Sequence, residues 1–393
     1  MSALRRVSTR RLLAVCALTV AAAIGITAGA LATTGGGPEP APKPLAKAVQ
    51  DALQAPALPG ISARIQFTNH LVAASGVEGA DPLLAGASGR LWASPAEGGK
   101  LRIELQTETG GGGDSQVLVS GRHFEIYDGS SRTVYRGTMP RERGEDSGQQ
   151  GWPPGLGEIE AKISKVEAHA DVSGAIPSDV AGQPTYTVRL APKHDGGLLA
   201  GIELAWDAGN GTPLRGAVYA KGESAPVLQL QATEVSYEAV PASVFEAGPP
   251  PGARVVELTP GEAAEGAGPG GEVVGEAAVR ESVPFALAAP ESLAGMPRSE
   301  VRGVEVEGRD AALIGYGKGL GGILVVESAS EPGNGDGSGL EGLGLPKVQI
   351  GGVQGEELET PLGTVIRFSR GGVDYVVAGS VPAAVAEEAA AGL

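Results

Sequence analysis

Residues 61–67 read Ile-Ser-Ala-Arg-Ile-Gln-Phe, a strict alternation of apolar and polar side chains. Residues 101–106, Leu-Arg-Ile-Glu-Leu-Gln, repeat the same period of two. Successive side chains of a β-strand point to opposite faces, so each stretch predicts a strand with one apolar and one solvent-facing side. The same pattern predicts further strands near residues 89–93, 124–126, 134, 186–190, 202–206, 214–220 and 228–232.

Two segments follow a helical period instead. Leu45, Val49 and Leu53 share one face of a predicted helix, and residues 156–170 carry apolar side chains at the same spacing. We therefore predict about nine strands and two helices between residues 44 and 245. The fold class is mainly β (α+β): a curved antiparallel half-barrel sheet with two helices packed on its concave face, plus a smaller α+β C-terminal domain. A change of strand phase predicts a β-bulge near Thr233.

The N-terminus resembles an export signal. Four arginines precede an uncharged apolar run from Leu12 to Ala32, which ends in a small-x-small sequence. This arrangement predicts a secretory signal peptide cleaved after Ala32, or a membrane anchor if it stays uncleaved. In either case the remaining chain is extracytoplasmic, being secreted or held at the outer face of the cytoplasmic membrane.

Composition limits the classes of function. The 393 residues carry a net charge of −16, which repels phosphate backbones and argues against nucleic-acid binding. The one cysteine, Cys16, lies in the signal segment, so the exported chain has no disulfide and no thiolate metal site. The 63 glycines and the low aromatic content of 4% are typical of short antiparallel strands joined by tight turns.

Changes of composition divide the chain. A Pro/Gly tether follows the signal segment, and an acidic Gly/Pro linker low in large apolar residues separates two folded parts. The predicted divisions are 1–32 signal peptide or anchor, 33–43 tether, 44–257 large β domain, 258–280 linker and 281–393 small α+β domain. The small domain is predicted to end in a helix over 382–391, while the acidic stretch 356–359 predicts a solvated loop.

No catalytic or metal site is predicted. The glycines of residues 317–322 (Gly-Lys-Gly-Leu-Gly-Gly) match a dinucleotide-binding pattern, but a strand follows where that site needs a helix, so they predict a hairpin turn. Residues 334–345 start like a calcium loop but place Leu345 where a glutamate ligand is required. The four histidines are scattered, and surface positions are expected for all of them. We therefore expect a protein that is not an enzyme and has no cofactor.

Three segments resemble the LolA/LolB lipoprotein-carrier superfamily. They are Asp179–Lys193 (DVAGQPTYTVRLAPK), Ile202–Tyr219 (IELAWDAGNGTPLRGAVY) and Phe245–Val255 (FEAGPPPGARV). The C-terminal part, with Val283-Pro-Phe and the ending Val373–Gly379, is similar to a small uncharacterised domain of high-G+C Gram-positive envelope proteins. The RseB/MucB regulators, which bind an anti-sigma factor, share the carrier-like first domain.

The resemblance implies a hydrophobic cavity between the sheet and its helices that holds the acyl chain of a lipid or lipoprotein. The residues expected to line it are Ile61, Ile65, Phe67, Leu101, Ile103, Leu105, Phe124, Ile126, Tyr186 and Val188. The same alternation fits a filled core equally well. Two functions stay open: a carrier of acyl chains in the cell envelope, and a sensor acting on a membrane-bound anti-sigma factor.

Overall fold

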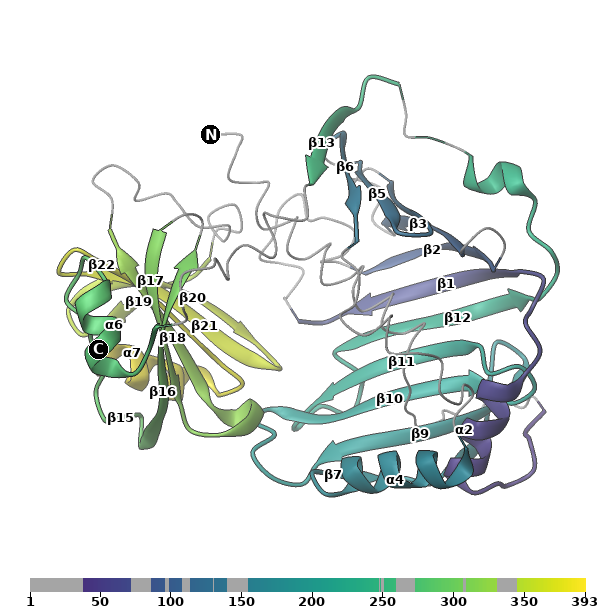
Figure 1. Ribbon diagram of the computed structural model, residues 1–393, viewed down its shortest axis with the longest axis horizontal. Coiled ribbons are helices and arrows are strands. Elements are labelled where there is room, and N and C mark those ends of the chain that lie inside the picture. The colour runs from purple at the N-terminus through teal and green to yellow at the C-terminus, as the bar shows by residue number, and fades with distance from the viewer. Residues whose placement is uncertain are drawn as a thin grey trace.

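A computed structural model describes residues 38–71, 86–95, 99–107, 114–129, 131–139, 155–246, 248, 251–258, 273–306, 309–330 and 345–393. The predicted signal segment 1–32, most of the calcium-like loop and residues 259–272 of the predicted linker lie outside this range. The described residues form two separate sheets (Figure 1).

Thirteen strands build the large sheet. In chain order they are β1 (Ile61–Asn69), β2 (Ala87–Ser94), β3 (Lys100–Thr107), β4 (Ser115–Ser120), β5 (His123–Asp128), β6 (Thr133–Thr138), β7 (Ala170–Val172), β8 (Ile176–Val180), β9 (Gln183–Pro192), β10 (Leu199–Asp207), β11 (Pro213–Ala220), β12 (Leu228–Ser236) and β13 (Arg254–Leu258). The predicted strands all have a counterpart here, whereas β4, β7, β8 and β13 were not predicted.

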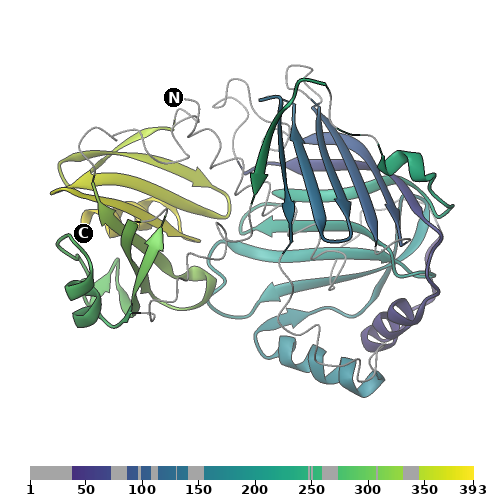
Figure 2. The same ribbon diagram turned by 45° about the horizontal axis from the view of Figure 1, so that its top comes forward.

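The order of strands across the sheet is β13-β6-β5-β4-β3-β2-β1-β12-β11-β10-β9-β7, with β8 also paired to β9. The predicted curved, antiparallel-rich sheet is confirmed, and it does not close into a barrel (Figure 2). One pair departs from the prediction, because β13 runs parallel to β6. The predicted bulge is confirmed as well: the register of β1 on β12 shifts between Arg64 and Ile65, opposite Thr233.

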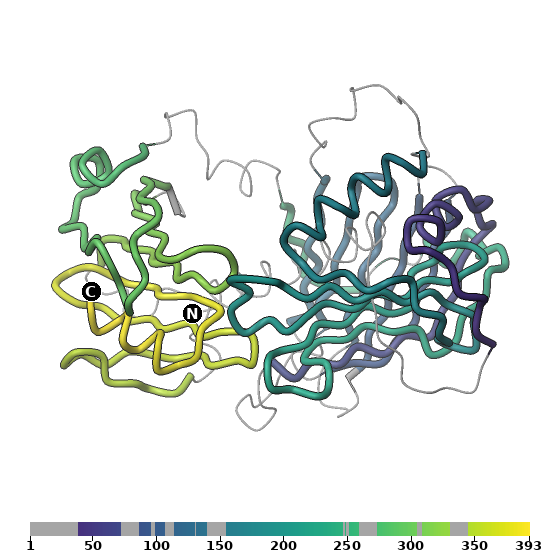
Figure 3. The backbone as a smooth tube through the Cα atoms, turned by 90° about the horizontal axis from the view of Figure 1, so that it is seen from below, coloured from purple at the N-terminus to yellow at the C-terminus, as the bar shows by residue number. Residues whose placement is uncertain are grey.

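Two helices lie at one end of this sheet. α2 (Leu45–Gln54) and α4 (Leu156–Glu167) contact each other (Figure 3). Ala48 of α2 is buried against Tyr186 and Trp206 of β9 and β10. α2 ends against the turn between β10 and β11, where the backbone approaches so closely that a side chain on Gly211 would meet Ala52. The helices therefore cover the β7–β9–β10 end of the sheet.

The second sheet has nine strands. They are β14 (Val273–Val274), β15 (Ser292–Leu293), β16 (Met296–Val306), β17 (Arg309–Tyr316), β18 (Ile323–Ala329), β19 (Lys347–Ile350), β20 (Val353–Thr360), β21 (Gly363–Arg370) and β22 (Val373–Gly379). α6 (Glu276–Ser282) and α7 (Ala383–Ala391) pack on it, burying Val279 and Ala386. The predicted closing helix is confirmed.

Two expectations for this part need correction. Residues 356–359 were predicted to be a solvated loop, yet they lie in β20, where Glu356 pairs across the strands with Arg367. Opposite charges on neighbouring strands stabilise such a pairing. Residues 273–280, assigned to the linker by sequence, instead supply β14 and most of α6, and they pack with the second sheet.

Candidate functional site

The ten residues expected to line a cavity all face one side of the large sheet. The strand register aligns Ile61 with Ala93, Leu101, Val119 and Phe124 in one row across five strands. A second row, shifted by two residues, consists of Ala63, Leu91, Ile103, Val117, Ile126, Tyr135 and Val256. Because side chains on the same face of paired strands are neighbours, the two rows form one apolar surface.

These residues divide into two clusters. Seven of the predicted residues lie in a cluster on β1–β6, which we call the helix-free face because it contains no residue of α2 or α4: Ile65, Phe67, Leu101, Ile103, Leu105, Phe124 and Ile126. Tyr186 and Val188 lie instead in the helix-covered core, 3% and 0% exposed. The Tyr186 hydroxyl also donates a hydrogen bond to the Ala41 carbonyl (2.6 Å). Ile61 is half-buried at the end of its row.

The helix-free face combines buried apolar side chains with half-buried ones. Phe67, Leu91, Val117, Val119 and Phe124 are half-buried. The other five predicted residues of the cluster are buried, with exposed fractions between 3% and 9%: Ile65, Leu101, Ile103, Leu105 and Ile126. Contiguous, partly exposed apolar side chains on one sheet face are the usual lining of a site for an apolar ligand. The helix-free face is therefore suited to contact with an apolar ligand, and it presents few polar side chains that could take part in a reaction.

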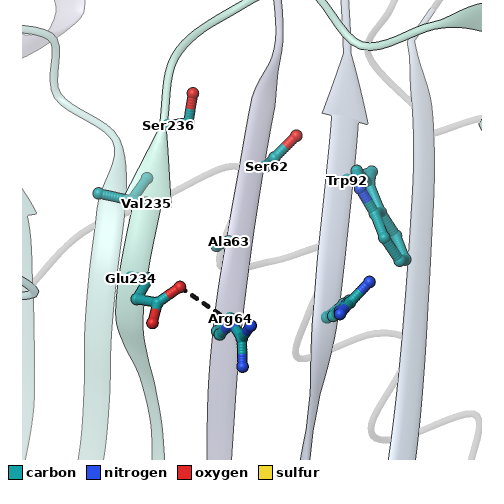
Figure 4. A pocket seen from close by; sticks show the side chains of 8 residues that line it. Ser62, Ala63, Arg64, Trp92, Glu234, Val235 and Ser236 are labelled. Atoms are coloured by element: carbon teal, nitrogen blue, oxygen red, sulfur yellow. Dashed lines mark ion pairs between the residues drawn. The ribbon is translucent and has the colours of Figure 1, made fainter.

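The opposite face of the same strands is polar and holds a shallow pocket of about 280 Å³ (Figure 4). Its polar lining is Ser62, Arg64, Arg90, Trp92, Glu234 and Ser236. Arg64 pairs with Glu234 through an Nε–Oε2 distance of 2.9 Å, and the guanidinium of Arg102 lies 5.9 Å from the centre of the Trp92 ring. Sequence analysis did not predict this pocket, although the position of Trp92 out of phase with Leu91 was an available signal.

A buried ion cluster ties β9, β10 and β11 together. Glu203 is 1% exposed and accepts a hydrogen bond from Arg189 (2.8 Å) and another from Arg215. The pKa of Tyr219 is raised to about 12, mainly by burial and to a smaller extent by a hydrogen bond to Glu203. A buried carboxylate with two guanidinium partners has its charge compensated, which makes this cluster a structural element.

The second sheet buries a glutamate in a different setting. Glu327 is fully buried, and its Oε2 accepts a hydrogen bond from the main-chain N–H of Ala288 (2.9 Å). Its Oε1 has no hydrogen-bond partner among the described residues. Burial is the main reason that the pKa of Glu327 rises to about 7.

No catalytic or metal-binding constellation is found in the described part of the chain. His70, His123, His169 and His194 are all exposed, which confirms their predicted surface positions. Within the same residues, no group of three or more His, Cys, Asp or Glu side chains is arranged to hold a metal. None of the described helices has the length and apolar character needed to cross a membrane.

Comparison with known proteins gives only distant similarities. No family model matches the chain, and no curated protein does. Among solved structures, the Pseudomonas aeruginosa MucA/MucB complex is 16% identical, covering 88% of this chain and 94% of that chain with a TM-score of 0.43. A LolA superfamily protein from Nitrosomonas europaea is 11% identical and covers 52% of this chain and 97% of that chain, with a TM-score of 0.20.

Both families named from the sequence are therefore present among the similar structures, as the resemblance predicted. An uncharacterised protein from Thermus thermophilus is also similar, with 11% identity over 54% of this chain and 98% of that chain and a TM-score of 0.34. Identities and scores this low carry no function from those proteins to this one.

Proposed function

We propose that this protein is a non-enzymatic, extracytoplasmic binder of apolar chains, which it holds on the helix-free face of β1–β6. The ligand class is the acyl chain of a lipid or lipoprotein. The observation that supports the proposal most directly is the pair of apolar rows that crosses these strands without a covering helix among the described residues. The predicted export segment supports the location.

The dimensions of the face suit such a ligand. The second row runs across the sheet from β1 to β13. At the usual spacing of neighbouring strands, this corresponds to roughly 30 Å of apolar surface. An acyl chain occupies about half of a bilayer core, or about 15 Å. Burying such a chain removes apolar surface from water on both partners and needs no polar partner on the protein.

The test is direct binding by the full exported chain. Native mass spectrometry of protein purified from its own host should detect a bound lipid, and a fluorescent fatty acid should increase in emission when mixed with delipidated protein. Phe124→Asp would place a charge on the face and should abolish the increase. The exposed substitution Lys162→Asp, on α4, is the control. Absence of both bound lipid and fatty-acid uptake would overturn the proposal.

The second candidate is a regulatory interaction with a membrane-bound anti-sigma factor. The observation that favours it is the additional folded unit around the second sheet, which an acyl-chain carrier does not need. Affinity purification from envelope extracts distinguishes the two. A single membrane protein that stays bound after lipid has been removed supports the regulatory function. Recovery of lipid alone supports the carrier function.

A further inference from the structure

The loop between β9 and β10 reaches across to the second sheet. The main-chain N–H of Gly321 donates a hydrogen bond to the carbonyl of Asp195 (2.7 Å). In the other direction, the N–H of Leu198 donates to the carbonyl (3.1 Å) and the hydroxyl (2.9 Å) of Ser380. We call these contacts, made by residues 195–198 with 319–321 and 380, the junction.

Both sides of the junction are held in place. The Ser380 hydroxyl donates to the carbonyl of Leu362 (2.7 Å) while it accepts from Leu198, so its hydrogen-bonding capacity is used on both sides. Gly319–Gly321 form a short 3₁₀ turn between β17 and β18. The predicted hairpin turn at residues 317–322 is thereby confirmed, and its conspicuous glycines lie at a contact with the large sheet.

The junction requires glycine for two reasons: the backbone conformation, and the close approach of atoms from the opposite side of the contact. Gly197 has φ +57°, and a Cβ added to it would lie 2.6 Å from the Cβ of Ser380. Gly319 has φ +62°, and its Cβ would lie 2.8 Å from the Cβ of Asp195. Carbon atoms held this close overlap, and a closely packed contact cannot accommodate them unless one part moves.

We propose that the junction is an intramolecular docking site that fixes the second sheet to the helix-covered end of the large sheet, so that the two parts move as one body. The glycines of residues 317–322 are the docking element, and the chain's own β9–β10 loop is the partner. The hydrogen bonds of Gly321 and Leu198 run in opposite directions across the contact, so each side both donates and accepts. A connecting segment alone would leave such parts free to reorient.

Two other glycines of the chain serve as controls, because they share the backbone conformation of Gly197 and Gly319 but have open space around them. Gly121 has the same φ of +57° as Gly197, and Gly371 has the same φ of +62° as Gly319, but a Cβ added to either would have no atom within 4 Å. Substitution by alanine should therefore cause similar backbone strain within each pair: Gly197→Ala compared with Gly121→Ala, and Gly319→Ala compared with Gly371→Ala. Only Gly197→Ala and Gly319→Ala should disturb the junction.

The measurements are amide hydrogen exchange at Leu198 and Gly321 and the radius of gyration from X-ray scattering, both on the full exported chain. Gly197→Ala and Gly319→Ala should each accelerate exchange at both amides by roughly tenfold or more and enlarge the radius of gyration. Gly121→Ala and Gly371→Ala should leave both quantities at wild-type values. Circular dichroism verifies that every variant is folded.

Ser380→Ala provides a milder test, because it removes the hydroxyl but keeps the carbonyl that Leu198 also contacts. It should accelerate exchange at Leu198 without enlarging the radius of gyration. Unchanged exchange in Gly197→Ala and Gly319→Ala, or equal changes in the matched glycines, would overturn the proposal. If a junction variant fails to fold, the wild-type chain decides the question, since amides of Leu198 and Gly321 that exchange at the unprotected rate would refute a bonded junction.

Discussion

The two halves of the large sheet differ in what lies over them, although their strands have the same pattern. On β9 and β10, Val188 and Trp206 are 0% and 4% exposed, because Ala48 brings α2 close to the sheet. On β1–β6, Phe67 and Phe124 have the same alternation and face the same side, yet they are half-buried. Ile103 and Ile126 of the same cluster are nevertheless 4% and 3% exposed. Alternation therefore specifies a face, whereas the residues that pack on it decide how deeply each side chain is buried.

The largest expected contrast comes from deleting one aromatic ring in each half. Trp206→Ala should cost about 3–5 kcal/mol of unfolding free energy, because a cavity would be left under α2. Phe124→Ala should cost less than half as much, since its ring is already partly solvated. Urea unfolding of the two variants measures the difference. Equal losses would show that the β1–β6 face is packed as tightly as the helix-covered core.

A smaller effect is expected where two buried glutamates are compared. Glu203 of the large sheet has two arginine partners, while Glu327 of the second sheet has one main-chain N–H. The pKa of Glu327 is raised from 4.5 to about 7, so the folded state holds the proton more tightly than the unfolded chain. The stability that this proton contributes is therefore complete below pH 4.5 and is lost as the pH rises through 7, a change of about 3 kcal/mol.

Glu327→Gln removes this titration. The variant should gain stability over the wild type at pH 8 and lose that advantage at pH 4.5, as measured by urea unfolding at both pH values. Glu359→Gln, at an exposed glutamate of β20 in the same sheet, serves as the control and should track the wild type. An identical pH dependence in Glu327→Gln and wild type would show that the carboxyl does not titrate in this range.

The smallest change in stability should come from introducing a larger side chain into each half of the large sheet. This comparison also says most about ligand binding. Val188→Trp overpacks the helix-covered core and should cost about 1–3 kcal/mol. If the helix-free face binds a ligand, Ile103→Trp should cost less than that and still reduce fatty-acid uptake. Melting midpoints and uptake are measured together. A large loss of stability in Ile103→Trp would support a filled core there and contradict the proposed function.

Sequence alternation was sufficient to predict the main strands and the side on which the candidate residues lie. It failed where a strand depends on a distant partner: the acidic residues of β20 are stabilised by pairing with β21, which no local pattern reveals. The short strands β7 and β8 likewise exist because both pair with β9. The separation of Tyr186 and Val188 from the other candidates had the same cause, since the position of α2 follows from the order of strands across the sheet.

That order also has a consequence for how the chain acquires its structure. The middle of the large sheet is the pairing of its first strand with its twelfth, in which Ile65 lies opposite Ala232. Contacts between residues so far apart in sequence make folding slow, because a long loop must close before the stabilising contacts form. If the N-terminal segment does direct export, β1 crosses the membrane well before β12. The meander β1–β6 would then wait on the far side with both edges unpaired, because β12 and β13 come later in the chain. This is the period of greatest exposure to aggregation.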